Sequence, residues 1–150
     1  MKFTNSLIKG KLLKRYKRFF ADIKVNNKII TAHCPNTGSM QGLLDEGNEV
    51  LVTEHNDPKR KLKFTLEIIK AKKRYVGVNT HRANKIVNHG LENKLISEFK
   101  TIKNIKPEFK FSDDTRFDFL CDDNLIEVKN VTLFRDCLLY TSPSPRDCRL

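Results

Sequence analysis

The first eighty residues alternate apolar and polar side chains in short runs that turn-forming residues separate. Phe19, Ala21, Ile23 and Val25 alternate with charged residues, which is the period of a half-buried strand. A hairpin turn is expected at 26–28, and further strands at 29–34, 48–55, 62–71 and 75–79. Five strands in so short a span predict a small closed β-barrel, with an OB-fold as the candidate.

The pattern changes near residue 80. A helix is predicted over residues 80–93, with Ile86, Val87 and Leu91 on one side. Three short strands are then expected, at 108–111, 115–121 and 125–131. The expected fold class is therefore mixed α+β. Its predicted parts are a barrel of residues 1–80, a helix with three strands at 81–136, and a tail at 137–150.

The last two predicted strands carry an unusual set of charges. If they pair antiparallel around the polar turn Asp122-Asp123, Leu120 lies opposite Leu125 and Asp118 lies opposite Glu127. Because side chains alternate between the faces of a strand, Asp118, Glu127 and Lys129 then share one face, and the neighbouring apolar residues point into a core.

Two carboxylates and a lysine on one face are the parts of a magnesium-dependent phosphodiesterase site. Hard oxygen ligands suit Mg²⁺, which polarises a phosphoryl oxygen and lowers the pKa of a bound water. The alternative is an ordinary cross-strand ion pair on a solvated face, because the pattern is short and common. Both interpretations stay open at this point.

Composition adds a strong positive charge. The 150 residues include 29 Lys and Arg against 18 Asp and Glu, a net charge of +11. Such a chain is attracted to polyanions, of which nucleic acid is the commonest. No stretch has the length of a transmembrane helix, and the opening residues lack the apolar run of a secretory signal, so a cytoplasmic location without membrane contact is expected.

The cations are clustered along the predicted barrel. One cluster spans residues 9–18 and includes Lys14, Arg15, Lys17 and Arg18, and others lie at 59–63 and 70–74. Each cluster read alone fits a solvated cationic face equally well, and the three together favour contact with the nucleic-acid backbone. Tyr16 and Phe19 are expected in the core rather than as stacking surfaces.

The end of the chain has a different character. Residues 137–147 resemble the translation of a sequencing adapter, so we set 137–150 aside and expect a fragment that is cut off near Asp136. The four cysteines show no paired Cys-x-x-Cys spacing, which argues against a zinc ribbon and predicts free thiols.

Several stretches, taken in order, resemble the sugar fermentation stimulation protein A family. The residues that carry the resemblance are Arg15–Phe19 with Ala21-Asp22, His33–Met40, Pro58–Lys61, Val78–Thr80 with Ala83-Asn84, Arg116–Phe119 and Glu127–Leu133. The segments His33–Met40 and Glu127–Leu133 are long and unusual enough to be specific.

This resemblance implies an OB-like domain followed by a partial domain of the PD-(D/E)XK nuclease fold, in a bacterial or archaeal DNA-binding protein named for an effect on sugar-utilisation genes. Asp118, Glu127 and Lys129 then take the places of the nuclease acids and lysine, and Glu108 matches a further acidic position. The implied DNA contacts are Lys14, Arg15, Lys17, Arg18, Lys59, Arg60 and Lys61.

Three functions remain open from the sequence. In the first, the chain binds DNA, most simply double-stranded DNA, without sequence preference and in a regulatory role. Alternatively it is a Mg²⁺-dependent nuclease, although the fragment itself is then expected to be inactive. A third alternative is an RNA-binding OB module, because basic five-stranded barrels also serve that purpose.

Overall fold

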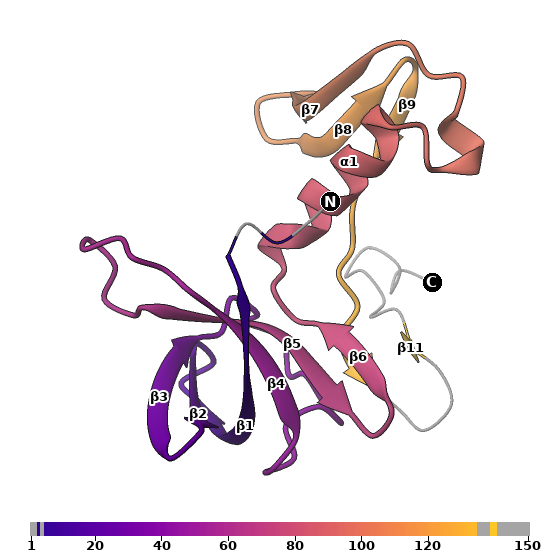
Figure 1. Ribbon diagram of the computed structural model, residues 1–150. Helices are drawn as coiled ribbons and strands as arrows, with labels where there is room; N and C mark the ends of the chain where they lie inside the picture. Colours follow the sequence, from indigo (N-terminus) through magenta and orange to yellow (C-terminus); the bar gives the residue numbers. More distant parts are fainter. Residues whose placement is uncertain (1–2, 4, 135–138, 141–150) are drawn as a thin grey trace. The chain divides into compact units, whose positions relative to one another are not determined.

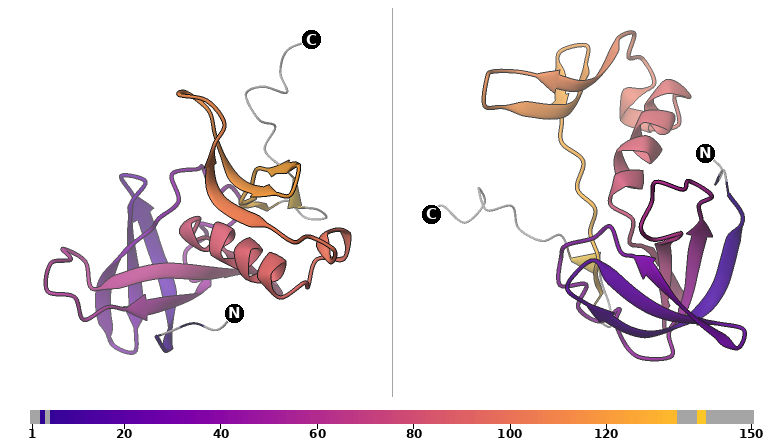
Figure 2. Two further views of the ribbon diagram at one scale, coloured as in Figure 1. Left: turned by 90° about the horizontal axis from the view of Figure 1, so that it is seen from above. Right: turned by 90° about the vertical axis from the view of Figure 1, so that its left-hand side faces the viewer.

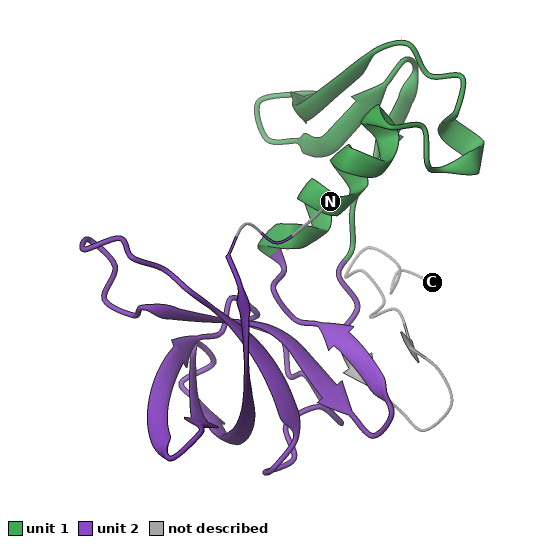
Figure 3. Cartoon of the chain, in the orientation of Figure 1, with its two compact units in different colours: residues 1, 81–129 green, residues 2–80, 130–150 purple. Residues whose placement is uncertain are grey.

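The computed structural model describes residues 3, 5–134 and 139–140 (Figure 1). These residues fall into two compact units, which are described separately (Figure 3). Residues 81–129 form one unit, called the second unit below. The described residues before 81 and after 129 form the other, called the barrel unit. Within the described residues, no helix is long and apolar enough to cross a membrane.

The barrel unit is built on a closed sheet (Figures 1 and 2). Its strands are β1 (Leu7–Tyr16), β2 (Phe20–Val25), β3 (Lys28–His33), β4 (Glu49–Glu54), β5 (Phe64–Ala71) and β6 (Arg74–Gly77). Neighbouring strands follow the order β3-β2-β1-β4-β5-β6, and a parallel pairing of β3 with β5 closes the ring. Five strands with this connectivity form the Greek-key barrel of an OB-fold.

Alternation along the strands builds the barrel core. Ala21 and Ile23 of β2 are fully buried, whereas Lys24 between them and the turn is exposed. Gly10 of β1 lies where a side chain cannot fit, because an added Cβ would stand 2.6 Å from Ile23 Cγ2. The turn Asn26-Asn27 joins β2 to β3 as predicted, with Val25 opposite Lys28 and Asn26 at a φ of +52°.

The predicted strand membership of the barrel is partly wrong. Strand β1 is absent from the sequence prediction, which instead used 75–79 as the fifth barrel strand. In the structure that region is β6, which pairs only with β5 among the described strands. Strand β1 escapes detection because its outward positions are cationic and because a register shift between Leu12 and Lys14 interrupts the alternation.

The second unit contains one helix and a three-stranded sheet. Its elements are α1 (His81–Glu92), the short 3₁₀ helix η1 (Ser97–Phe99), and the strands β7 (Ile105–Lys110), β8 (Arg116–Cys121) and β9 (Asn124–Ile126) in the order β7-β8-β9. Leu91 of α1 and Phe119 and Cys121 of β8 are its buried core. Pro107 lies in edge strand β7, where its missing N–H costs no ladder hydrogen bond.

The predicted register of the last hairpin is confirmed, although its second strand is shorter. Leu120 lies opposite Leu125, and the turn at Asp122-Asp123 is where the sequence places it. Strand β9 ends at Ile126, so Glu127 and Lys129 follow the strand rather than belong to it. The pairing of Asp118 with Glu127 across the ladder is therefore replaced by a different contact, described below.

A small two-stranded sheet follows later in the chain, and each unit contains one buried cysteine among its described residues. Strands β10 (Leu133–Phe134) and β11 (Leu139–Tyr140) pair antiparallel. Cys34 and Cys121 are buried free cysteines, as predicted for these two, whereas Cys137 and Cys148 lie outside the described residues. Burial raises the pKa of the Cys34 thiol, so it is not a ready nucleophile.

Candidate functional site

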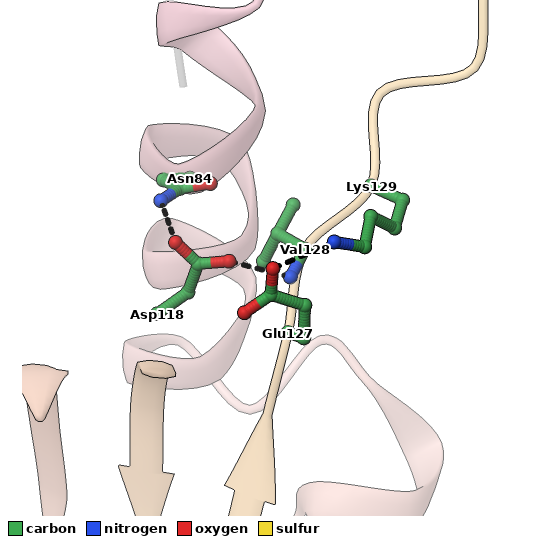
Figure 4. Close-up of polar contacts among 5 residues, drawn as sticks. All are labelled: Asn84, Asp118, Glu127, Val128 and Lys129. Atoms are coloured by element: carbon green, nitrogen blue, oxygen red, sulfur yellow. Dashed lines mark hydrogen bonds and ion pairs between the residues drawn. The ribbon is translucent and has the colours of Figure 1, made fainter. Parts of the chain in front are cut away.

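Asp118 stands at the centre of the predicted acidic site. It is half-buried on β8, and Figure 4 shows it pointing toward α1. Its Oδ1 accepts a hydrogen bond from Asn84 Nδ2 at 2.5 Å, and its Oδ2 accepts one from the backbone N–H of Val128 at 2.7 Å. Each oxygen retains acceptor capacity, because an ionised carboxylate has about four lone-pair sites.

The bond to Val128 brings the segment after β9 against Asp118. Val128 lies between Glu127 and Lys129, so their side chains flank the point of contact. The Lys129 ammonium pairs with Glu127 Oε1 at 2.6 Å, and in the view of Figure 4 the Glu127 carboxylate lies between Asp118 and this ammonium. Glu127 and Lys129 are exposed and within reach of a ligand.

Glu108 takes a different position from the other two acids. The pairs Pro107–Phe119 and Phe109–Phe117 bracket it in the β7–β8 ladder, which places its backbone across from Asp118. Its backbone has a φ of +52°, and its exposed carboxylate lies 3.7 Å from the Arg116 guanidinium. Among the described residues, no three His, Cys, Asp or Glu side chains are grouped so that they hold a metal ion.

Two of the predicted basic segments, the β1–β2 turn and the β4–β5 loop, lie at the same end of the barrel. Phe20 pairs with His33, and His33 pairs with Thr65, so the start of β2, the end of β3 and the start of β5 form one row. The β1–β2 turn, residues 17–19, and the β4–β5 loop, residues 55–63, open onto this row. At about 5 Å per strand spacing, the strand ends from which the two segments leave are about 10 Å apart. We call these two segments the basic loops.

The β1–β2 turn presents its cations through an unusual backbone. Lys17 and Arg18 have φ values of +48° and +63°, a region that glycine and asparagine adopt more easily. Both side chains are exposed, as are those of Lys59 and Lys61 in the β4–β5 loop. A strained turn that keeps two cations at its tip is typical of a site where those side chains are used.

The other predicted cations have partners inside the fold. Arg15 donates to the carbonyl oxygens of Arg18 and Asn36, at 2.8 Å and 2.6 Å from Nη2. Arg60 Nη2 donates to Thr65 Oγ1 at 3.0 Å, and Lys14 lies 3.7 Å from Asp22 Oδ2. Arg15 and Arg60 therefore hold the basic loops in place while Lys17, Arg18, Lys59 and Lys61 face solvent.

Two asparagines that the sequence reasoning does not place in a site have central roles. Asn36 is buried, and its Oδ1 accepts a hydrogen bond from the Gly38 N–H. Its Nδ2 donates to Thr132 Oγ1, and its backbone carbonyl accepts a hydrogen bond from Arg15 Nη2. Asn84 fixes Asp118. The only sequence signal for either residue is its presence in a segment that resembles the family, because a polar residue's partner is set by tertiary folding.

Comparison with known proteins gives two family matches that adjoin near residue 80, where the first unit boundary lies. A family model described as "SfsA N-terminal OB domain" matches residues 13–78. A second, described as "Sugar fermentation stimulation protein RE domain", matches residues 81–144, which extends past Asp136 into the segment set aside above.

Similar curated proteins are named as homologues of the same kind. A "Sugar fermentation stimulation protein homolog" from Pelagibacter ubique is 64% identical over 91% of this chain and 60% of its own length. Another from Alteromonas mediterranea is 44% identical over 89% of this chain and 61% of its own length. The chain thus spans about 60% of the length of these relatives.

A solved structure has the same fold. It is titled "The structure of Pyrococcus Furiosus SfsA in complex with Ca2+" and matches 81% of this chain and 51% of its own, with a TM-score of 0.67 at 21% identity. The fold of this chain is therefore one known from experiment.

Proposed function

This chain belongs to the sugar fermentation stimulation protein family, and we propose that it binds double-stranded DNA through the phosphate backbone, without sequence preference. The observation that carries the proposal is that the two basic loops leave from neighbouring strand ends at one end of the barrel. In OB-folds the loops at these two positions are the ones that contact nucleic acids. A role in regulating sugar-metabolism genes, as the family name suggests, is part of the same proposal.

The chemistry of the basic loops favours backbone contact over base reading. Lys17, Arg18, Lys59 and Lys61 are exposed point charges on loops, not a helix or ribbon shaped for the major groove. Cations of this kind displace counterions from phosphates, and this displacement supplies most of the free energy of nonspecific binding. Arg15 and Arg60 support the loops from behind, which limits the entropy lost on binding.

We expect duplex binding to weaken steeply as salt rises. If four loop cations each neutralise one phosphate, the slope of log K against log salt is about −3.6. Fluorescence anisotropy with a labelled 20-base-pair duplex, repeated at several NaCl concentrations, measures this slope. Two duplexes of unrelated sequence are expected to give the same curve. An affinity that does not change between low and moderate salt would contradict backbone binding.

A second candidate function is metal-dependent cleavage of DNA, carried by Asp118 and its neighbours. The specific observation is that the Val128 N–H bond holds the Glu127–Lys129 segment against Asp118. We propose Asp118, Glu127 and Lys129 as the reacting set, with Glu108 as a further acid. Lys129 would hold Glu127 in position and face the phosphate.

The donor set fits Mg²⁺, which commonly uses one or two carboxylates and keeps several waters. Asp118 and Glu127 would hold the ion, and Glu108, turned toward Arg116, would join only after its side chain moves. The bound ion would lower the pKa of a water and neutralise phosphate charge. The similar Pyrococcus protein, by its title, was solved with Ca²⁺, which prefers the same oxygen ligands.

Metal titration tests this second candidate. We expect calorimetry to detect Ca²⁺ or Mg²⁺ binding that Glu127→Gln abolishes, because that change removes one charged ligand from an exposed position. Asp123→Asn, an exposed acid in the β8–β9 turn, is the matched control and should bind as the parent does. Glu108→Gln shows whether the third acid takes part.

The same variants are then incubated with supercoiled plasmid and Mg²⁺, with and without chelator. Nicking that disappears with chelator and with Glu127→Gln would establish nuclease activity. Equal heats of metal binding for Glu127→Gln and the parent would exclude this second candidate, and DNA binding would stay as the proposed function.

A further inference from the structure

An aromatic pair lies on the outer face of the barrel. Tyr16 and Phe20 are cross-strand partners in β1 and β2, and their rings stack with centroids 5.5 Å apart and planes 17° from parallel. They lie on the face opposite the buried residues Ala21 and Ile23, because side chains alternate along β2. The expectation that Tyr16 and Phe19 are core residues is wrong, since Tyr16 is only half-buried on this outer face and Phe19 is 45% exposed.

Cations surround this aromatic pair. The Lys14 ammonium lies 5.5 Å from the centre of the Tyr16 ring. Farther along the same face Lys11 and Lys24 are direct cross-strand partners, both exposed. Two like charges in opposite positions of a ladder destabilise it, so the protein gives up some stability to keep them together. Glu49 on the other side of Lys11 offsets part of this repulsion, and an anion lying across Lys11 and Lys24 would offset the rest.

One acid on this face is already neutralised. Asp22 accepts hydrogen bonds from Tyr16 Oη at 3.2 Å and from Thr31 Oγ1 at 2.8 Å, and it faces Lys14 at 3.7 Å. Its role is to fix the Tyr16 ring, and its charge is balanced by Lys14. A second acid, Glu49 of β4, lies opposite Lys11 and pairs with Lys9 at 2.5 Å, so the strip carries more cations than acids.

The strip continues into a hollow. From Phe20 to Lys24 is about 14 Å along β2. Beyond Lys24 lies an open hollow of about 380 Å³, lined by Lys9, Gly10, Lys11, Lys24, Asn26, Asn27 and Glu49. Gly10 is part of its wall, and the amides of Asn26 and Asn27 add neutral donors. The strip thus runs from stacked rings, over paired lysines, to a polar depression.

We propose that this outer strip of β1 and β2 binds single-stranded nucleic acid, with a base stacked on the Tyr16–Phe20 pair and phosphates at Lys11, Lys14 and Lys24. The proposal rests on the proposed nucleic-acid binding and names a second ligand form for it. In a duplex the flat faces of the bases are covered by their neighbours, so only an unpaired strand offers a base to the rings. Duplex binding by the basic loops requires no such ring.

Substitution of Tyr16 tests the proposal against a matched tyrosine. Tyr75 of β6 is also exposed and also has a lysine, Lys70, 5.1 Å above its ring. Tyr16→Leu and Tyr75→Leu are compared by anisotropy on labelled oligo-dT, oligo-U and a duplex. Tyr16→Leu should weaken binding to the single strands about tenfold or more, because stacking on an aromatic side chain contributes strongly to such binding. Tyr75→Leu should change it less than twofold.

Tyr16→Phe separates stacking from structure. It keeps the ring and loses the bond to Asp22, so single-strand binding should stay within about threefold of the parent. Circular dichroism confirms that each variant is folded, and comparison of the oligo-dT and oligo-U arms tells which single strand is preferred.

Three results would overturn the proposal while leaving duplex binding intact. The first is an equal loss in Tyr16→Leu and Tyr75→Leu. The second is a loss in Tyr16→Leu of the same size for duplex and single strand. The third is no measurable single-strand binding by the parent under conditions where the duplex binds.

Discussion

Removing the four exposed cations of the basic loops is expected to lower duplex DNA affinity about 100-fold at low salt and to flatten the salt dependence by roughly 3 to 4 units of slope. The variant carries Lys17→Asn, Arg18→Asn, Lys59→Gln and Lys61→Gln. Asparagine is chosen for the turn because it tolerates the left-handed backbone of Lys17 and Arg18, so the hairpin keeps its shape. The measurement is duplex anisotropy across a salt series.

A control variant removes the same charge elsewhere. Lys73→Gln, Arg74→Gln, Lys85→Gln and Lys100→Gln change exposed cations outside the basic loops. If binding depends on the basic loops, this control should lose less than a few-fold in affinity and keep most of the slope. Equal losses in the two variants would mean that net charge, rather than the loops, carries the binding, and the proposed function would lose its structural basis.

Truncation of Phe119 is expected to cost about 3–5 kcal/mol and to unfold the second unit selectively. Phe119 is 2% exposed and is the largest of the three residues that form this unit's buried core. The unit has little other apolar burial to compensate for a cavity. Hydrogen exchange read by mass spectrometry should show fast exchange across residues 81–129 in Phe119→Ala, with protection of the barrel strands unchanged.

Phe111→Ala is the matched control. Phe111 is 63% exposed and makes an edge contact with Phe117 at 6.0 Å. Its loss should cost under about 1.5 kcal/mol, the range of a single aromatic contact. Barrel strands that lose protection together with the second unit in Phe119→Ala would show that the two units unfold as one, against the division described above.

The sequence segments that resemble the family were sufficient to predict the family and much of the fold. Short-range patterns are sufficient for the hairpin at Asn26-Asn27 and for the register of Leu120 with Leu125, because a turn and two adjacent strands are set by neighbouring residues. Strand β1 is harder to find, because its bulge and outward lysines disguise the alternation. The sequence names Asp118, Glu127 and Lys129 as a set, but the Val128 N–H bond to Asp118, rather than strand pairing, holds the segment against Asp118, and the activity of the set stays a prediction.

The amino-acid order by itself determined the family, through segments that resemble it, and it determined the barrel, the later helix and sheet, and the positive charge through local periodicity and composition. Tertiary structure alone decided which side chains meet. The bond of Asn84 to Asp118 and the row from Phe20 through His33 to Thr65 join elements that are distant along the chain, and the bond of Val128 to Asp118 forms beyond the end of the paired strands. Such contacts depend on how the strands close and cross, which local sequence does not encode.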